Sequence, residues 1–180
     1  MTKIALPSVE YLRACFDLDE DAGVLIWRVR PRDHFRTQRG WRAFNSQQAG
    51  KRCGVTTSGG YKIVMVAKRL FKVHRIIFAI YYGRLPGFDV DHKDGDPTNN
   101  RPSNLREATA TQNQLNKAAW KRVASGVKGV YPKDGRYCAK IRKPGGESVW
   151  LGMFDSVDAA KAAHRAAVEK FHGEFGRPNA

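Results

Sequence analysis

The sequence predicts an α+β protein made of two regions, and three observations support this prediction. Short apolar segments separated by Gly and Pro turns, such as 61–66 and 70–73, predict β-hairpins in the first region. Residues 88–113 contain two short extended segments around a polar loop, followed by the start of a helix. Residues 126–175 contain three strand candidates and an alanine-rich helix. We therefore expect N-terminal hairpins with a ββα core, followed by a small three-stranded antiparallel sheet plus helix.

Composition and charge indicate a globular protein with an anionic partner. The chain has 180 residues, of which 42% are hydrophobic and 27% charged, which allows one ordinary domain or two small ones. Its net charge is +15, which is typical of nucleic-acid binding and less so of binding to an anionic membrane. Residues 1–122 hold 22 Lys and Arg against 11 Asp and Glu, and residues 123–180 hold 10 against 6. A basic tail alone does not give this distribution, so we expect both halves to contact phosphate.

The cysteines and the N-terminus indicate a reducing, cytoplasmic compartment. Cys15, Cys53 and Cys138 lie far apart and form neither a disulfide framework nor a CxxC zinc motif. The N-terminus lacks the apolar core of a signal peptide, and no apolar run approaches transmembrane length. We expect no membrane partner, and a location near the nucleoid of a bacterial or phage-infected host cell.

The central segment brings together side chains suited to phosphodiester hydrolysis. Asp91 and His92 follow a short extended run, and Asn113 lies on a helix opened by Thr109 or Thr111. Asp91 and Asn113 supply hard oxygen donors that suit Mg²⁺ or Mn²⁺. His92 titrates near neutrality and can act as a general base. Each residue alone also has a structural explanation: Asp91 and His92 as a surface pair and Asn113 as a solvated helix residue. The loop residues Asn99, Asn100 and Asn104 have turn formation as their alternative.

The segment from about 73 to 120 resembles the HNH endonucleases, which have a ββα-metal fold, in the variant common among phage and homing enzymes. The resemblance places the family's metal-binding Asp at Asp91 and its first His at His92. It places the Asn that fixes the loop at Asn104, and the last member of the motif at Asn113. His74 and Arg75 match a His-Arg pair usual in this group. They face the scissile phosphate or support the metal site, although packing is an equal alternative for His74.

The basic stretch 28–52 lacks a clear period and is predicted to be a loop. A solvated loop and a loop that becomes ordered on the DNA backbone are the two alternatives. In the second, the DNA-binding candidates are Arg36, Arg39 and Arg42.

The C-terminal segment has a different character. Residues 117–125 are predicted to form a linker. Three strands are predicted at residues 126–131, 135–142 and 147–154. Asp155–Asp158 is predicted to cap a helix that ends at Gly173. The segment resembles the APETALA2/ethylene-response-factor DNA-binding domain, in which a sheet enters the major groove. Two positions depart from the family, because Tyr131 stands where the family has an Arg and Asp134 stands where it has a Trp. The DNA sequence that the family recognises therefore cannot be assigned to this chain. For Trp150, burial in the core of the domain is the alternative to a DNA contact. The DNA-binding candidates that the resemblance implies are Tyr131, Lys133, Arg136, Lys140, Arg142 and Trp150.

These features predict an endonuclease region at 1–122, with its motif core at 73–120, and a DNA-binding domain at 126–180. The expected function is metal-dependent cleavage of double-stranded DNA by a monomer or homodimer. A DNA-binding regulator without catalytic activity, and a structure-specific or RNA nuclease, are the alternatives.

Overall fold

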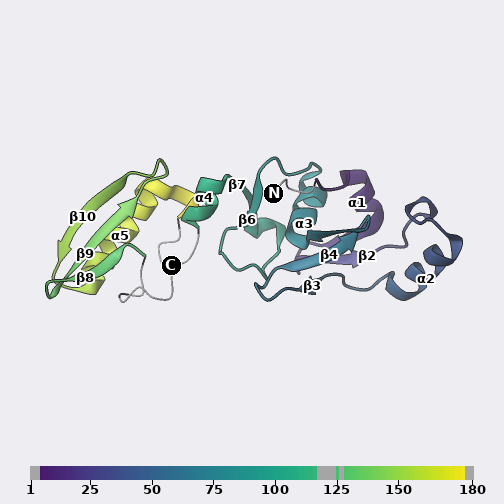
Figure 1. Ribbon diagram of the computed structural model, residues 1–180, viewed down its shortest axis with the longest axis horizontal. Coiled ribbons are helices and arrows are strands. Elements are labelled where there is room, and N and C mark those ends of the chain that lie inside the picture. Colours follow the sequence, from purple (N-terminus) through teal and green to yellow (C-terminus); the bar gives the residue numbers. More distant parts are fainter. Residues whose placement is uncertain (1–4, 117–124, 126–127, 177–180) are drawn as a thin grey trace. The chain divides into compact units, whose positions relative to one another are not determined.

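The computed structural model describes residues 5–116, 125 and 128–176 and has a mixed α+β fold (Figure 1). The chain divides into two compact units, residues 1–92 with 96–107, and residues 93–95 with 108–180. The α+β prediction is confirmed, with hairpins in the first unit and a three-stranded antiparallel sheet plus helix in the second. None of the helices described here is long and apolar enough to cross a membrane.

The first unit contains two-stranded and three-stranded antiparallel sheets around a central helix. Its sheets have the strand orders β1-β2, β3-β4-β5 and β6-β7. Its helices are α1 (Val9–Cys15), α2 (Gln38–Gln48) and α3 (Val73–Tyr82), with 3₁₀ turns η1 (Arg32–His34) and η2 (Pro102–Asn104). Its strands are β1 (Phe16–Asp19), β2 (Val24–Trp27), β3 (Val55–Thr56), β4 (Lys62–Val66), β5 (Arg69–Lys72), β6 (Asp89–His92) and β7 (Leu105–Ala108).

Local sequence signals set the ends of α1 and α3. The Ser8 hydroxyl accepts a hydrogen bond from the Tyr11 amide and so caps α1. Gly83 ends α3 with φ +66°, a left-handed conformation that glycine adopts without a steric penalty. Serine and glycine are the residue types that favour these two cap positions.

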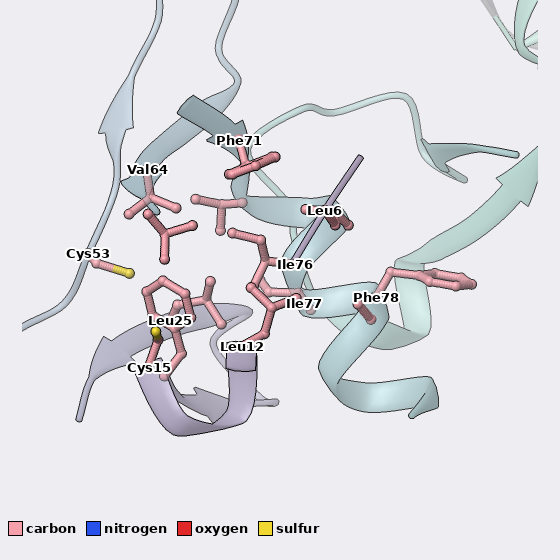
Figure 2. Close-up of a cluster of buried hydrophobic side chains, with 14 of the residues drawn as sticks. Leu6, Leu12, Cys15, Leu25, Cys53, Val64, Phe71, Ile76, Ile77 and Phe78 are labelled. Atoms are coloured by element: carbon pink, nitrogen blue, oxygen red, sulfur yellow. The ribbon is translucent and has the colours of Figure 1, made fainter. Parts of the chain in front are cut away.

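The core of the first unit gathers around α3 (Figure 2). Ile76 and Ile77 are fully buried on this helix and pack in one cluster with Leu12 of α1 and Leu25 of β2. Leu105, the first residue of β7, belongs to the same cluster. The hydrophobic effect therefore fixes both hairpins and the start of β7 on one helix.

The prediction of a loop at 28–52 was wrong, because this stretch contains α2. Thr37 caps the helix by accepting a hydrogen bond from the Gly40 amide, yet no residue of α2 is fully buried. Trp41 Nε1 donates to the Arg30 carbonyl at 2.8 Å and Asn45 Oδ1 accepts from the Arg30 amide at 2.9 Å, while the partly buried ring of Phe44 packs against Trp27 of the core. The polar bonds to the Arg30 backbone leave no period in the sequence, so they could not reveal the helix.

The second unit contains α4 (Ala110–Leu115) and a sheet in the order β10-β9-β8, covered by α5 (Val157–His172) and followed by η3 (Gly173–Phe175). The strands are β8 (Val130–Lys133), β9 (Arg136–Arg142) and β10 (Ser148–Phe154). Pro132 was expected in a turn but lies in β8, an edge strand, where proline is tolerated. The predicted linker at 117–125 lies outside the described residues, apart from Ser125.

Alanine allows α5 to lie close to its sheet. Ala160 packs with Val130 and Ala139, and Val168 packs with Ile141 in a neighbouring cluster. These contacts bury one face of the sheet and leave the opposite face to solvent.

The turn between β4 and β5 is strained and can be stabilised. Ala67 and Lys68 form a two-residue turn with φ +49° and +60°, values that glycine adopts at far lower cost. Lys68→Gly is expected to raise the free energy of unfolding by about 0.5–1 kcal/mol, as measured by urea denaturation. Arg69→Gly, in the adjoining strand, should instead destabilise the protein, and an equal effect of both changes would contradict the strain at Lys68.

Candidate active site

Strand β6 ends in the Asp-His pair that the sequence singles out. Asp91 and His92 are both buried, and β6 pairs with β7 as a two-stranded ribbon. A buried carboxylate beside a buried imidazole is costly unless both have polar partners. The partners of these two side chains therefore define the site.

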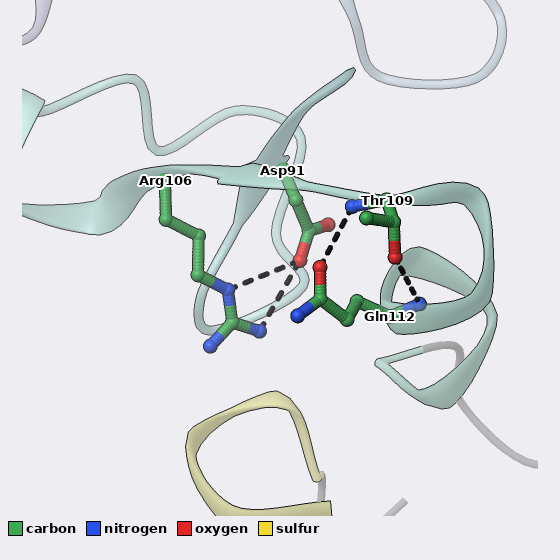
Figure 3. A network of polar contacts seen from close by, with 4 residues as sticks. All are labelled: Asp91, Arg106, Thr109 and Gln112. Carbon is green, nitrogen blue, oxygen red and sulfur yellow. Dashed lines mark hydrogen bonds and ion pairs between the residues drawn. The ribbon is translucent and has the colours of Figure 1, made fainter. Parts of the chain in front are cut away.

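Asp91 forms a buried ion pair with Arg106 of β7 (Figure 3). Arg106 Nη2 lies 3.2 Å and Nε 3.4 Å from the same carboxylate oxygen, Oδ2. The side chains of both residues are about nine-tenths buried, which makes this the most enclosed ion pair among the described residues. Arg106 therefore balances the charge of Asp91 and fixes the orientation of its carboxylate.

His92 is held by Asn100, whose side chain is almost completely buried. His92 Nε2 lies 2.9 Å from Asn100 Oδ1, and Asn100 Nδ2 points toward the Thr98 carbonyl at 3.5 Å. With the amide in this orientation its oxygen faces the ring, so Nε2 carries the proton and donates it to Asn100. In the neutral form of the ring, this tautomer has its lone pair on Nδ1, which is the arrangement a general base requires.

The loop between β6 and β7 is held by its own polar side chains. Asn104 Nδ2 donates to the Asn99 carbonyl at 2.8 Å, next to Asn100. Asp96 Oδ1 accepts from both the amide and the hydroxyl of Thr98, each at 2.8 Å. These bonds close the loop into a compact form that places Asn100 against His92.

The two N-terminal hairpins support the same loop from outside. A Cβ added at Gly23, in the β1–β2 turn, would lie 2.5 Å from the carbonyl carbon of Asn100. One added at Gly60 would lie 2.8 Å from Pro97 Cγ. Only glycine permits these close approaches, and Arg101 Nε also donates to the Asp21 carbonyl at 2.5 Å. The hairpins therefore set the position of the loop and, through Asn100, that of His92.

His74 of α3 packs against the catalytic candidates. Its ring lies 4.8 Å from the His92 ring in an edge-to-face arrangement. Burial, followed by electrostatic interaction with the neighbouring His92, Lys72 and Arg75, lowers the pKa of His74 to about 3. His74 is therefore neutral across the physiological range, and its predicted support of the metal site stays a prediction. Its Nδ1, and Nε of Arg75, have no hydrogen-bond partner among the described residues.

Asn113 lies on α4, which belongs to the second unit. The Thr109 hydroxyl accepts from the Gln112 amide while the Gln112 side chain accepts from the Thr109 amide, so a capping box opens this helix (Figure 3). Asp91 lies in the first unit, and the approach of Asp91 and Asn113 to one metal ion stays a prediction.

The oxygen donors of Asp91 and Asn113 suit Mg²⁺ or Mn²⁺ better than Zn²⁺. No group of three or more His, Cys, Asp or Glu side chains in the described part of the chain is placed to hold a metal. Mg²⁺ prefers oxygen ligands such as carboxylates and amide carbonyls, and it usually keeps several water molecules.

The C-terminal sheet presents its six predicted DNA-binding residues on one face. The register pairs Lys133 with Arg136 and Trp150 with Lys140, and residues paired directly across strands share a face. The remaining members follow by alternation along the strands, and α5 covers the opposite face. Trp150 is 56% exposed, so the alternative of a core position for this residue was wrong.

Three of these residues contact neighbouring side chains. Lys140 Nζ lies 5.1 Å from the centroid of the Tyr131 ring, and Arg136 pairs with Asp155 at 2.7 Å. The three arginines predicted to bind DNA in the first unit, Arg36, Arg39 and Arg42, are exposed on or just before α2.

Sequence reasoning missed three residues that shape the site, namely Gly23, Asn100 and Arg106. Asn100 was interpreted as a turn former, which explains its loop position but not its burial against His92. Arg106 carried one signal, since it follows Leu105 in the second short extended segment that the sequence predicts. The role of Gly23 depends on packing between segments more than 70 residues apart and has no local signal.

Comparison with known proteins gives three matches. Residues 71–115 match the model of a family described as HNH endonuclease. An uncharacterised HNH endonuclease, L560, of Acanthamoeba polyphaga mimivirus is 33% identical over 111 residues, which is 60% of this chain and 57% of that protein. The chain thus matches little more than half the length of this relative. A solved structure described as DNA binding and cleavage by the HNH homing endonuclease I-HmuI aligns with a TM-score of 0.42 and 20% identity, covering 92% of this chain and 90% of that one.

Packing of Gly23 against the active-site loop can be tested by adding one methyl group. Gly23→Ala is expected to lower the free energy of unfolding by about 2–4 kcal/mol, because its Cβ would meet the backbone of Asn100. Gly50→Ala is a matched control, since Gly50 also has positive φ but has nothing within 4 Å of an added Cβ. Urea denaturation of both variants separates the clash from the φ penalty, and equal losses would contradict the packing.

Proposed function

Since residues 71–115 match the HNH endonuclease family, we propose that this protein is a metal-dependent endonuclease that hydrolyses phosphodiester bonds of double-stranded DNA. The observation that carries the proposal is the buried His92–Asn100 hydrogen bond next to the Asp91–Arg106 ion pair. Together they supply an oriented base beside a fixed carboxylate.

His92 takes a proton from the attacking water through Nδ1, because Asn100 holds the proton on Nε2. Asn104 is a positioning residue, since its amide ties the loop that carries Asn100. Asp91 and Asn113 would hold one Mg²⁺ or Mn²⁺, which when bound offsets charge on the phosphate and on the leaving oxygen. The family resemblance implies 5′-phosphate and 3′-hydroxyl products.

The C-terminal sheet supplies a second DNA contact in this proposal. Its exposed face combines basic side chains, which neutralise phosphates, with Trp150 and Tyr131, which offer aromatic surface. The covered face is occupied by α5, so the exposed face is the one open to a duplex. This arrangement supports the resemblance to APETALA2-type domains and is the basis for assigning DNA binding to the six sheet residues.

Plasmid cleavage tests the proposed activity. The protein should nick or linearise supercoiled plasmid in Mg²⁺ and not in EDTA, and His92→Ala should slow cleavage by about 10²–10⁴-fold while binding DNA within a few-fold of the unsubstituted protein. Gel analysis of cleavage and a mobility shift measure the two properties separately. A shift without nicking in Mg²⁺ or Mn²⁺ would favour a DNA-binding regulator, and unchanged cleavage by His92→Ala would remove His92 from its role.

Substitution of Asn100 tests the orientation of the base. Asn100→Ala is expected to slow cleavage at least about tenfold, because the ring loses the acceptor that fixes its tautomer. Asn100→Asp keeps an acceptor oxygen at this position and should recover most of the rate. Single-turnover kinetics at saturating DNA, with urea denaturation to compare stabilities, measure the effect. Equal rates for the two variants at equal stability would show that the bond does not position His92.

A further inference from the structure

The second unit contains a cavity between its sheet and the helices α4 and α5. The cavity has a volume of about 400 Å³, and all its described lining residues belong to this unit. Sites that bind small molecules in proteins have volumes in this range. We call it the edge cavity, and its lining includes Leu115, Lys128, Gly129, Arg142 and His164.

The edge cavity forms where β9 runs beyond the start of β8. The Lys140 amide donates to the Gly129 carbonyl at 2.9 Å, directly before β8 begins, and β9 continues to Arg142. There His172, the last residue of α5, replaces a strand partner, since its Nε2 donates to the Arg142 carbonyl at 2.7 Å. Beyond Gly129 the outer edge of β9 therefore faces the cavity and not another strand of the described part of the chain.

Gly129 lets the backbone approach His164 closely at this point. Gly129 has φ +86°, and an added Cβ would lie 2.4 Å from the Lys140 carbonyl oxygen and 2.6 Å from His164 Nε2, so only glycine fits. His164 is 5% exposed, and burial, followed by electrostatic interaction with His172 and Lys128, lowers its pKa. This wall is therefore a neutral imidazole at neutral pH, and the charge of the cavity comes from the residues around it.

The edge cavity carries positive charge. Lys128, Lys140 and Arg142 line it, and its described lining residues include no Asp or Glu. Elsewhere in the same unit, by contrast, Lys143 pairs with Glu147 at 2.9 Å. The cavity therefore favours an anionic ligand, which would supply the negative charge that this lining lacks.

Two of the cations in the edge cavity are held by backbone carbonyls. Arg142 Nε donates to the Gly146 carbonyl at 3.0 Å, and its Nη1 and Nη2 make no hydrogen bond with a described residue. Lys128 Nζ donates to the Gln114 carbonyl of α4 at 3.4 Å. A guanidinium that is fixed at Nε and keeps both amino groups for a ligand suits the oxygens of a phosphate group.

Apolar side chains form the rest of the wall. Leu115, Ile141 and Val168 line the same cavity, together with Tyr131. A ligand that contacts both parts of the wall combines a phosphate with a flat group of low polarity. A nucleoside 5′-phosphate has this combination, and its phosphomonoester carries about 1.5 to 2 negative charges at neutral pH, against one for a phosphodiester.

We propose that the edge cavity binds a nucleoside 5′-phosphate, either a free mononucleotide or the 5′-terminal nucleotide of a DNA strand. The phosphate contacts Arg142 and Lys128, and the base packs against the apolar wall. The choice of a nucleotide among phosphate esters rests on the proposed function, because a protein that acts on DNA meets such groups. Binding itself needs no metal ion and no cleavage, so it can be tested separately.

Isothermal titration calorimetry of the full chain in EDTA tests the inference. Deoxyadenosine 5′-phosphate (dAMP) is expected to bind, and deoxyadenosine at least about tenfold more weakly, because it lacks the charged hydrogen-bond acceptor. Arg142→Met and Lys128→Met should each weaken dAMP binding about tenfold for the same reason. Lys161→Met removes a charge from α5 outside the cavity and should bind dAMP as the unsubstituted protein does.

NMR signals of the histidine rings locate the bound nucleotide. dAMP should shift the ring signals of His164 and His172, which line the edge cavity, and leave those of His34 in the first unit unchanged. Saturable binding without a shift at His164 or His172 would place the nucleotide elsewhere and overturn the inference.

A short single strand, with and without a 5′-phosphate, separates the two sources of the ligand. If the terminal phosphate tightens binding about tenfold and Lys128→Met removes that gain, the edge cavity binds DNA ends. If dAMP binds and the terminal phosphate adds nothing, the cavity binds the free nucleotide. If neither holds, the inference fails.

Three further results would overturn the inference. Equal affinities for dAMP and deoxyadenosine would show that the phosphate is not recognised. Inorganic phosphate that binds as tightly as dAMP would show that the apolar wall makes no contact. Unchanged dAMP affinity in both Lys128→Met and Arg142→Met would place the site outside the cavity. Each of these results leaves the proposed function standing, whereas dAMP binding by a protein that cleaves no plasmid would overturn the proposed function alone.

Discussion

The hydrogen bond between His92 and Asn100 is the interaction on which the rest of the site depends. It joins the end of β6 to the loop that follows, and it leaves the lone pair of the ring on Nδ1. The loop holds its shape through Asn104, and the β1–β2 turn lies directly against it at Gly23. The N-terminal hairpins therefore contribute to the framework that orients His92. The ion pair of Asp91 with Arg106 fixes the neighbouring carboxylate in the same ribbon.

Features of the fold with local causes could be predicted from the sequence. Ser8 and Ser156 cap their helices through side-chain bonds to amides three residues on, and such bonds need only nearby residues. Thr109 opens α4 for the same reason. Short apolar segments bounded by turn residues located the β4–β5 hairpin, because strands and turns depend on nearby residues.

Features with tertiary causes could not be predicted in this way. Helix α2 is attached through Trp41 and Asn45 to the backbone of Arg30, and such bonds leave no period in the sequence. Of the candidate site, the pair Asp91–His92 and its loop were found by motif, whereas Asn100 and Arg106 became visible only through their contacts. A buried partner of a catalytic residue is defined by distance in space, which spacing along the chain does not encode.

The central claim is that Asp91 and Asn113 share one divalent metal ion close to His92. Anomalous diffraction from crystals of the protein grown with Mn²⁺ and a DNA duplex tests this most directly. We predict a single manganese peak within about 2.0–2.3 Å of a carboxylate oxygen of Asp91 and the amide oxygen of Asn113, with His92 Nδ1 directed toward the scissile phosphate. A manganese ion bound elsewhere, or Asp91 and Asn113 too far apart to share it, would contradict the assignment.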